Sequence, residues 1–350
     1  MTFHKFENIQ YPYFIADIAA NHDGSLQRAK DLVWLSKEAG ADCAKFQHFL
    51  ANKIVNDKEF QQITSLKTHQ SDWKKSVSEI YDQYHFRREW TEEIKEECIK
   101  AEIDFSSTPY DYEAIQEIKE LVPFIKIGSG DVSWLEHIEN CLKTELPIII
   151  ATGACSIDDV DRAMSLIGSY NNQHCIMQCN TNYTVDEDKF RYVNLNVLDY
   201  YKEKYPKAIL GLSDHTTNFT SVLGGVAKGV KIIEKHFTDD NSREGPDHKF
   251  AINPKNWRTM VDLSRQLVDT LGDGKKKVEE NELNAYVVQR RSCVALNDLA
   301  AGHVICREDI QFLRPCPEGA VQPYEYENII GKRLKKALQK NQSFRWENIS

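Results

Sequence analysis

Several absences narrow the class of this 350-residue chain. No stretch approaches eighteen apolar residues, and the N-terminal segment MTFHKFENIQYPYF lacks a charged region followed by an apolar run. We therefore expect neither a membrane span nor a secretion signal, but a soluble cytoplasmic protein. Basic residues number only 44 against 53 acidic ones, for a net charge of −9, and both are spread along the chain. This distribution argues against a nucleic-acid-binding face.

The nine cysteines do not form a pairing pattern. Their number is odd, and most lie inside apolar segments, as Cys43, Cys141 and Cys293 do. We expect reduced, buried thiols rather than a disulfide framework. Cys175 and Cys179 would lie about 13 Å apart on an extended strand, too far to share one ion, so no cysteine is expected to bind metal.

Short apolar runs alternate with helical patterns through most of the chain, and no solenoid repeat or low-complexity tract interrupts them. The predicted strands are residues 13–20, 43–49, 103–108, 124–129, 147–152, 174–179, 208–213 and 231–236. A polar insertion occupies residues 50–86, and a last helix is expected at 254–271. Eight strand–helix units predict a parallel (β/α)8 TIM barrel. A doubly wound open sheet is the alternative, but no G-x-G-x-x-G follows the first strand, which excludes its dinucleotide-binding form.

The composition changes after the last predicted helix. A charged, glycine-containing run, GDGKKKVEENE, predicts a linker over residues 273–289 between a barrel domain (1–272) and a C-terminal module (290–350). The module contains short strands and turns, so a small, mostly-β domain is expected. At about sixty residues it is near the lower limit for independent stability, and we expect it to pack against another surface.

Two histidines occupy matched positions in residues 208–250. His215 and His236 follow or end two consecutive predicted strands, where a parallel α/β sheet presents its chemistry. Neighbouring strands lie about 5 Å apart, so both imidazoles could reach one divalent metal. Each histidine alone is more simply a satisfied polar residue at a strand end. Their matched placement, with Asp247 and His248 closing the segment, favours a site.

Further polar residues end the other predicted strands and would open onto the same face of a barrel. They are Asp17 with Asn21 and His22, Lys45, Gln47, Thr108, Lys126, Ser129, Asp131, Thr152, Thr181, Tyr183, Ser213 and Glu234. Two lysines, several hydroxyls and two imidazoles suit a phosphorylated carboxylate substrate with a divalent metal. Each lysine alone could instead form a structural salt bridge.

An ordered set of motifs is more specific than this pattern. N-H-x-G, K-F-Q, S-T-P, K-I-x-S-G, S-D-H-T and E-K-H-F…G-P-D-H together resemble the sialic acid synthase family. The tail motifs R-R-S, A-G-x-V-I-x-x-E-D-I, L-R-P and I-I-G-K resemble that family's C-terminal antifreeze-like (SAF) domain. The resemblance covers nearly the whole chain. It implies condensation of phosphoenolpyruvate with an N-acylated hexosamine to a nine-carbon 2-keto sugar acid: N-acetylneuraminic, legionaminic or pseudaminic acid.

The resemblance also implies roles for individual residues. His215 and His236 would bind a divalent metal, Mn²⁺ or Mg²⁺, and Asp17 would occupy the position of a glutamate near that metal. Phosphoenolpyruvate would be held by Lys45, Thr108, Lys126, Ser129 and Ser213. The sugar would face Gln47, Asp131, Tyr183 and Asp247, and would be reached by Arg314 from the neighbouring subunit of a domain-swapped homodimer.

Four departures from the family pattern cluster at the phosphate and sugar positions. Asp17 and Asp131 replace glutamates, Ala151 stands where serine is common, and the segment Asn180-Thr181-Asn182-Tyr183-Thr184 lacks the usual Y-P ending. Because the histidine pair is intact, we expect the reaction to be retained and the acceptor to be the open question. Two alternatives remain: an aldolase on the same barrel, using a metal or a Schiff base at Lys45 or Lys126, and a non-catalytic sugar-binding homologue.

Overall fold

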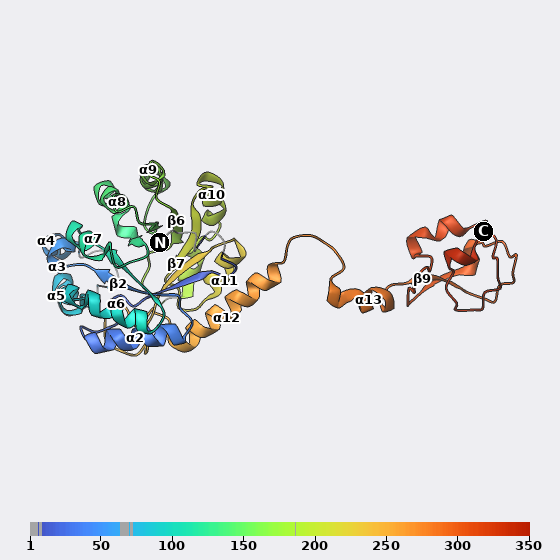
Figure 1. Cartoon of the computed structure of the whole chain (residues 1–350), viewed down its shortest axis with the longest axis horizontal. Coiled ribbons are helices and arrows are strands. Elements are labelled where there is room, and N and C mark those ends of the chain that lie inside the picture. Colours follow the sequence, from blue (N-terminus) through green and yellow to red (C-terminus); the bar gives the residue numbers. More distant parts are fainter. Residues whose placement is uncertain (1–5, 7–8, 64–69, 71–72, 186) are drawn as a thin grey trace. The chain divides into compact units, whose positions relative to one another are not determined.

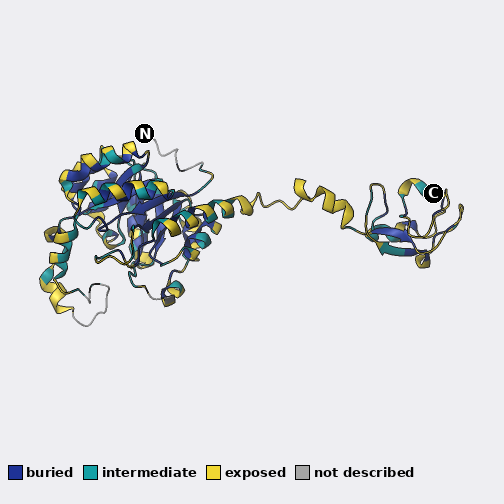
Figure 2. Ribbon diagram, turned by 90° about the horizontal axis from the view of Figure 1, so that it is seen from below, coloured by how far each residue is buried: buried dark blue, intermediate teal, exposed yellow. Residues whose placement is uncertain are grey.

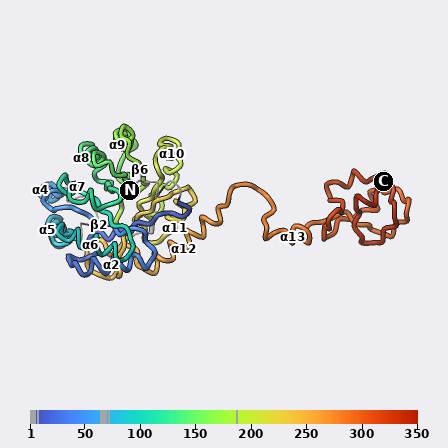
Figure 3. Tube along the Cα trace, viewed as in Figure 1, coloured from blue at the N-terminus to red at the C-terminus, as the bar shows by residue number. Residues whose placement is uncertain are grey.

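The computed structural model describes residues 6, 9–63, 70, 73–185 and 187–350. Parts of the N-terminal segment (1–5 and 7–8) and of the predicted insertion (64–69 and 71–72) therefore lie outside the described residues. The chain divides into two compact units, Met1–Gly272 and Asp273–Ser350, whose paths can be followed in Figure 3.

The first unit is a closed barrel of eight parallel strands in sequential order, which confirms the predicted TIM barrel and excludes the open sheet (Figure 1). The strands are β1 (Tyr13–Asp17), β2 (Cys43–His48), β3 (Asp104–Pro109), β4 (Ile125–Ile127), β5 (Ile148–Ala151), β6 (His174–Cys179), β7 (Ile209–Asp214) and β8 (Ile232–His236). Closure comes from pairing of β1 with β8, in which Asp17 lies opposite His236.

Helices follow the strands around the outside of the barrel (Figure 1). They are α2 (Leu26–Glu38), α6 (Thr91–Lys100), α7 (Tyr112–Ile118), α8 (Leu135–Leu142), α9 (Ile157–Gly168), α10 (Val197–Lys204), α11 (Thr220–Ala227) and α12 (Pro254–Leu271). Several begin at side-chain caps: Ser156 and Asp159 form a capping box at α9, and Asn253 caps α12 with Pro254 in its first turn.

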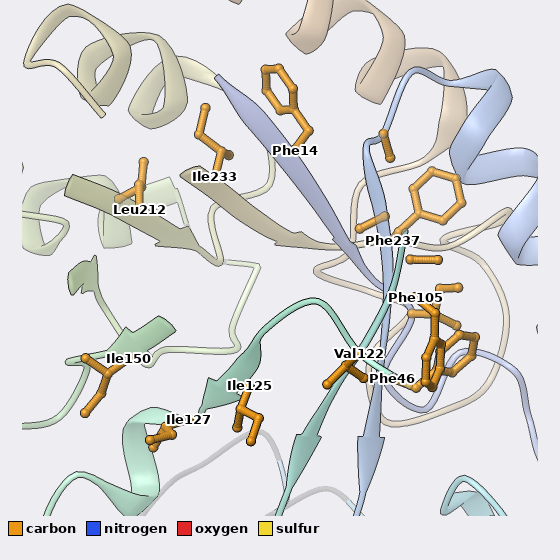
Figure 4. Close-up of a cluster of buried hydrophobic side chains, with 14 of the residues drawn as sticks. Phe14, Phe46, Phe105, Val122, Ile125, Ile127, Ile150, Leu212, Ile233 and Phe237 are labelled. Atoms are coloured by element: carbon orange, nitrogen blue, oxygen red, sulfur yellow. The ribbon is translucent and has the colours of Figure 1, made fainter. Parts of the chain in front are cut away.

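Alternation along the strands separates two buried layers. Outward-facing residues such as Phe14, Phe46, Phe105, Ile150 and Ile233 pack against the helices, as the labelled side chains of Figure 4 show. Inward-facing apolar residues form a second cluster inside the barrel, made of Phe6, Tyr13, Ile15, Cys43, Phe124, Ile149, Ala151, Cys175, Met177, Cys179 and Ile232. Figure 2 shows the buried strands enclosed by helices whose outer faces are exposed.

Two predicted segments, the first strand and the insertion, differ most from the structure. The first strand ends at Asp17 rather than at residue 20, because the chain turns at Ala19, which has a φ of 46°. The described part of the 50–86 insertion is helical, comprising α3 (Ala51–Ile54), α4 (Asp57–Gln62) and α5 (Val77–Tyr84). The insertion therefore builds structure between β2 and α6 rather than a simple loop.

The second unit is small and mostly β, as predicted. Strands β9 (Ser292–Ala295) and β10 (Ile310–Leu313) pair in antiparallel fashion, and isolated bridges such as Ala320 with Arg345 extend the pairing. Its core includes Cys293, Val321 and Phe344. The short 3-10 helices are η6 (Arg307–Asp309), η7 (Pro323–Ile329) and η8 (Trp346–Asn348). The predicted linker is partly helical, with η5 (Glu280–Glu282) and α13 (Leu283–Val288).

No helix within the described ranges is both long and apolar enough to cross a membrane.

Candidate active site

The polar residues at the strand ends lie on the inner face of the barrel, because each is an even number of positions from an inward-facing apolar residue of the same strand. Asp17 follows Ile15 at a spacing of two, and Lys45 follows Cys43 in the same way. The register places Asp17 opposite Lys45 on one side and opposite His236 on the other. Charged groups thus replace the apolar layer at the carboxyl ends of the strands, where barrels carry their chemistry.

Two lysines and two carboxylates form a buried ion-pair cluster there. Lys45 Nζ lies 2.7 Å from Asp17 Oδ2 and 3.9 Å from Glu234 Oε2, and it donates to Thr108 Oγ1 at 3.3 Å. Lys126 Nζ lies 3.1 Å from Glu234 Oε1, which also accepts a hydrogen bond of 3.1 Å from Ser213 Oγ. Each of the four charged residues is 5% exposed or less. Buried charges this close are retained because each has an opposite partner.

The electrostatics of this cluster differ from one group to the next. Burial raises the pKa of Asp17, against the opposing effect of Lys45. Burial acts in the same direction on Glu234, but Lys126 and Lys45 outweigh it and lower the pKa of that carboxyl to about 2. For Lys45, burial is outweighed by the carboxylates of Asp17 and Glu234, and the pKa is raised. Glu234 is therefore a fixed anion, whereas Asp17 is the carboxylate better suited to accept a proton.

The two predicted histidines lie together beside this cluster. The ring centroids of His215 and His236 are 5.3 Å apart, and His236 Nε2 is 3.9 Å from Asp17 Oδ2. Tyr183 packs edge-on against both rings, at 4.8 Å from His215 and 6.1 Å from His236. Burial lowers the pKa of His236 to about 4, so this imidazole is neutral at pH 7. A neutral imidazole is the form that binds metal.

The residues present fit a divalent metal. His236 Nδ1 is buried and makes no hydrogen bond in the structure, and the two rings are close enough to reach one ion. Among the described residues, no group of three His, Cys, Asp or Glu side chains is placed to hold a metal. A metal here would take two imidazole ligands from the chain and fill its remaining positions with substrate or water.

A cavity of about 190 Å³ opens beside His236. Its strand-derived residues are Gln47, which donates to Asp17 Oδ2 at 3.1 Å, and His236. Asp247, from the loop after β8, also lines it and accepts from the Ala20 amide at 3.1 Å. Burial raises the pKa of Asp247. The remaining lining residues are mainly aromatic and aliphatic: Ala20, Phe49, Ile54, Gln70, Trp73, Ile80, Tyr81, Tyr84, Tyr110, Tyr183 and Pro246.

The loops after β4, β5 and β6 meet next to the lysines. Ser129, in the 3-10 turn η3 (Ser129–Asp131), accepts from the Gly153 amide at 2.9 Å. A side chain at Gly153 would collide with Thr181 Oγ1, at 1.9 Å from its Cβ, so this crossing requires glycine. Asp131 Oδ2 is buried without a hydrogen-bond partner, and burial raises the pKa of this carboxyl to about 6. Ala151 packs in the apolar layer below and offers no hydroxyl.

Some predicted strand-end residues have structural roles instead. Asn21 donates to the Phe237 carbonyl at 2.9 Å, and His22 packs among Phe46, Phe86 and Trp90 outside the barrel wall. Thr152 donates to the Met177 carbonyl at 2.8 Å. The turn at Ala19 redirects the chain after β1, so Asn21 and His22 leave the inner face of the barrel. Arg314 belongs to the second unit, where it is exposed just after β10.

Sequence reasoning missed two residues of the site and placed a third, Glu234, on the inner face without assigning it a role. Glu234 lies two residues before His236 and so shares its face. Tyr110 follows Thr108 at the same spacing, and its ring lines the cavity. Lys189, which is 4% exposed, donates to the His215 carbonyl at 2.6 Å and also to the Thr184 carbonyl. The alternation of side chains along a strand identifies Glu234 and Tyr110, whereas nothing in the sequence indicates Lys189.

Comparison with known proteins relates both units to one group of synthases. The model of the NeuB family matches residues 32–276, and the model of the SAF domain matches residues 290–350. The N,N'-diacetyllegionaminic acid synthase of Legionella pneumophila subsp. pneumophila is 32% identical over 96% of this chain and 94% of its own length. The N-acetylneuraminate-9-phosphate synthase of Homo sapiens is 29% identical over 93% of this chain and 89% of its own.

A solved structure agrees with these matches. The N-acetylneuraminic acid (sialic acid) synthetase from Leptospira borgpetersenii superposes with a TM-score of 0.69 at 25% identity. The match covers 79% of this chain and 90% of that one.

Proposed function

Because the chain belongs to the NeuB family, we propose that it is a nonulosonic acid synthase, which joins phosphoenolpyruvate to an N-acylated hexosamine and releases phosphate. The product is a nine-carbon 2-keto sugar acid. The observation that carries this proposal is the pair of buried lysines, Lys45 and Lys126, on the inner face of the barrel beside the imidazole of His236. Ammonium groups in a site shielded from water attract phosphate and carboxylate strongly.

Phosphoenolpyruvate would occupy the lysine side of the site. Lys45 and Lys126 would contact its phosphate and carboxylate, and the hydroxyls of Thr108, Ser129 and Ser213 would complete the hydrogen bonding. In the structure, the carboxylates of Asp17 and Glu234 balance the charges of the two lysines. A bound anion would compete with these carboxylates for the same ammonium groups.

The two imidazoles would hold the metal. When bound by His215 and His236, Mn²⁺ or Mg²⁺ would supply a Lewis acid that polarises the aldehyde oxygen of the open-chain acceptor.

The remaining chemistry falls to the chain's own residues. C3 of phosphoenolpyruvate adds to the aldehyde carbon, forming the new C–C bond, and the aldehyde oxygen gains a proton. Water then adds at C2 and loses a proton to Asp17, whose pKa is raised by burial. The C2 hydroxyl then gives its proton to the departing phosphate as the bond between C2 and the phosphate oxygen breaks with its electrons leaving on phosphate, which yields the 2-keto acid. The lysines stabilise the phosphate charge throughout, by about 2–4 kcal/mol per well-placed donor.

The Schiff-base aldolase is disfavoured by the state of Lys45. A lysine that attacks a carbonyl needs a lowered pKa, whereas the carboxylates of Asp17 and Glu234 outweigh burial and raise that of Lys45. Lys126 is also paired with Glu234. Borohydride reduction in the presence of pyruvate should leave the protein unmodified.

The acceptor would lie in the cavity, facing Gln47, Tyr183 and Asp247, whereas Asp131 lies outside the cavity lining. Arg314 of a second copy of the chain would reach its N-acyl group in a domain-swapped homodimer. The names of the relatives leave the acceptor open, since one is named for a 9-phosphate product and another for a diacetylated one.

Phosphate release from phosphoenolpyruvate tests the proposal. Release should require a divalent metal and an N-acyl hexosamine, with the product mass identified by mass spectrometry. Lys126→Met should abolish release, whereas Lys202→Met, on the exposed face of α10, should not change it. Absence of release across a panel of N-acyl hexosamines, including N-acetylmannosamine and diacetamido-trideoxyhexoses, would contradict the synthase activity.

A further inference from the structure

Two oppositely charged side chains are buried on the outer side of the barrel wall. Asp214 and Lys235 lie opposite each other on β7 and β8, two positions after Leu212 and Ile233. Leu212 and Ile233 pack between the strands and the helices (Figure 4), so alternation gives the charged pair the same outward direction. Lys235 Nζ lies 2.5 Å from Asp214 Oδ2, and each side chain is 1% exposed. An ion pair is thus embedded in the apolar layer behind the strands.

Thr216 closes a ring of hydrogen bonds around this pair. Lys235 Nζ also donates to the Thr216 carbonyl. The Thr216 amide donates to Asp214 Oδ1 at 3.2 Å, and the Thr216 hydroxyl donates to Asp214 Oδ2 at 2.8 Å. Thr216 Oγ1 lies 2.9 Å from the hydroxyl of Ser221, in the first turn of α11. All four residues are buried, so this network joins the ends of β7 and β8 to the start of α11.

The network holds the backbone on both sides of His215. Asp214 precedes this histidine and Thr216 follows it. Lys235, which binds both of them, directly precedes His236. One ammonium group therefore ties the chain beside one imidazole to the chain beside the other. The two rings point the opposite way, into the barrel, where their centroids are 5.3 Å apart.

The two imidazoles have weak hydrogen-bond partners of their own. His236 Nδ1 makes no hydrogen bond within the described part of the chain, and its Nε2 lies 3.9 Å from Asp17 Oδ2, beyond hydrogen-bond distance. His215 Nδ1 lies 3.7 Å from Cys179 Sγ, and a thiol is a weak partner. Metal-binding imidazoles are usually oriented by a hydrogen bond to the other ring nitrogen. Here the placement of the rings depends instead on packing and on the backbone that carries them.

The cost of burying charge also indicates a role beyond stability. Taking two charges out of water is unfavourable, and apolar side chains of similar volume are often at least as stable in such a place. A hydrogen-bonded pair nevertheless fixes one geometry, which apolar contacts do not. We propose that Asp214 and Lys235 are positioning residues that set the separation of the two imidazoles for one divalent metal. This inference rests on the proposed function, in which His215 and His236 hold that metal.

Replacement of the pair by apolar side chains tests the proposal in the full-length protein. In the double variant Lys235→Met with Asp214→Leu, we expect the urea midpoint of unfolding to stay close to that of the parent. The Kd for Mn²⁺, measured by titration calorimetry without substrates, should rise at least about ten-fold. An unchanged Kd in the folded double variant would overturn the proposal, as would absence of Mn²⁺ binding by the parent.

Ile233→Ala is the matched control for general loosening of the barrel. It removes apolar contacts from the same layer and the same strand but leaves the hydrogen-bonded network in place. The urea midpoint should therefore fall, while the Kd for Mn²⁺ should stay within about two-fold of the parent value. A loss of Mn²⁺ affinity equal to that of the double variant would assign the effect to destabilisation and overturn the proposal.

Thr216→Val decides the question if the double variant does not fold. Valine keeps the shape of the side chain but removes the hydroxyl that donates to Asp214. We expect the Kd for Mn²⁺ to rise about three-fold, and a parent-like value would overturn the proposal.

Phosphate release from phosphoenolpyruvate by the parent separates this inference from the proposed function. If the parent releases phosphate and the double variant binds Mn²⁺ as the parent does, the positioning role is wrong and the synthase function stands. If the parent releases none, the synthase function is contradicted, and the Mn²⁺ affinities still decide the role of the pair.

Discussion

At the scale of single residues, Glu234 has the most unusual environment in the site. Its carboxylate is 5% exposed and faces Lys126 at 3.1 Å and Lys45 at 3.9 Å. These lysines lower its pKa to about 2 although burial acts to raise it, so the group stays ionised at any physiological pH. A permanent anion between two phosphate-binding candidates serves to keep both lysines charged and in place, at the cost of competing with the substrate.

Glu234→Gln should therefore have two opposite effects. Loss of one partner from a buried ion-pair cluster should lower the free energy of unfolding by about 3 kcal/mol. Removal of the competing charge should strengthen binding of inorganic phosphate by about ten-fold. Urea denaturation measures the first effect and titration calorimetry the second.

The matched control for this substitution is Glu113→Gln. Glu113 pairs with Lys53 at 2.8 Å, but its side chain is 60% exposed, so its substitution should leave the free energy of unfolding close to that of the parent. The affinity of Glu113→Gln for inorganic phosphate should equal that of the parent protein. Unchanged or weaker phosphate binding in Glu234→Gln would mean that the lysines are not the anion site.

The sequence predicted most of these residues because strand ends in a barrel share one face. Lys45, Thr108, Lys126, Ser213 and His236 meet as expected. Asn21 and Thr152 do not, because a position near a strand end does not fix the direction of a side chain. The turn at Ala19 and the outward hydrogen bonds of these two residues decided their orientation, and neither is encoded in strand periodicity.

At the scale of elements, the strands and helices were predictable and the loops that shape the site were not. Hydrophobic runs located all eight strands to within three residues at either end, since burial on both faces of a parallel sheet leaves a strong signal. The insertion after β2 appeared only as a polar stretch. Its packing against Phe49, through Tyr81 of α5 at 5.2 Å, is a tertiary contact that no local pattern specifies.

Lys189 links two such loops and is proposed as a positioning residue. It lies in η4 (Glu187–Tyr192) and donates to the carbonyls of Thr184 and His215, so one buried ammonium joins the loop of Tyr183 to the loop of His215. Lys189→Met would keep the aliphatic stem but leave both carbonyls without this donor. We expect a loss of about 2 kcal/mol in stability and an affinity for Mn²⁺ about ten-fold lower.

Two further variants separate positioning from general destabilisation. Lys189→Arg keeps a donor at this place and should recover most of the Mn²⁺ affinity, measured by titration calorimetry without substrates. Lys207→Met, at an exposed position before β7, should match the parent. If Lys189→Met lost stability but bound Mn²⁺ normally, the lysine would be structural only.

At the scale of the whole molecule, the chain is a barrel joined to a small domain, and the described residues of neither unit include a group of three His, Cys, Asp or Glu side chains placed to hold a metal. In the proposed role of Arg314, the small domain contributes to the reaction only by placing this arginine at the active site of a barrel. In a domain-swapped homodimer, each barrel would be completed by the second copy. Since one complete site then needs parts of two chains, mixed dimers can distinguish action between copies from action within one.

A heterodimer of Arg314→Ala with Lys126→Met provides the distinguishing measurement. The Arg314→Ala chain has an intact barrel and an altered C-terminal module. The Lys126→Met chain has an altered barrel and an intact C-terminal module. If Arg314 acts across copies, one barrel of this dimer is complete, and tandem-tag purification should recover about half of the parent kcat/KM for the acceptor. If Arg314 acts within its own chain, activity should not exceed the mean of the two homodimers.

The reciprocal arrangement makes the opposite prediction and so controls for stability. Here the parent chain is paired with a chain that carries both Arg314→Ala and Lys126→Met. The parent barrel would receive the altered module, so action across copies predicts no more than about half the activity of the Arg314→Ala homodimer, whereas action within one chain predicts about half of the parent activity. Because both heterodimers contain the same two substitutions, a difference in their activity cannot come from altered folding. Equal activity in the two would show that the assignment of Arg314 to a neighbouring site is wrong.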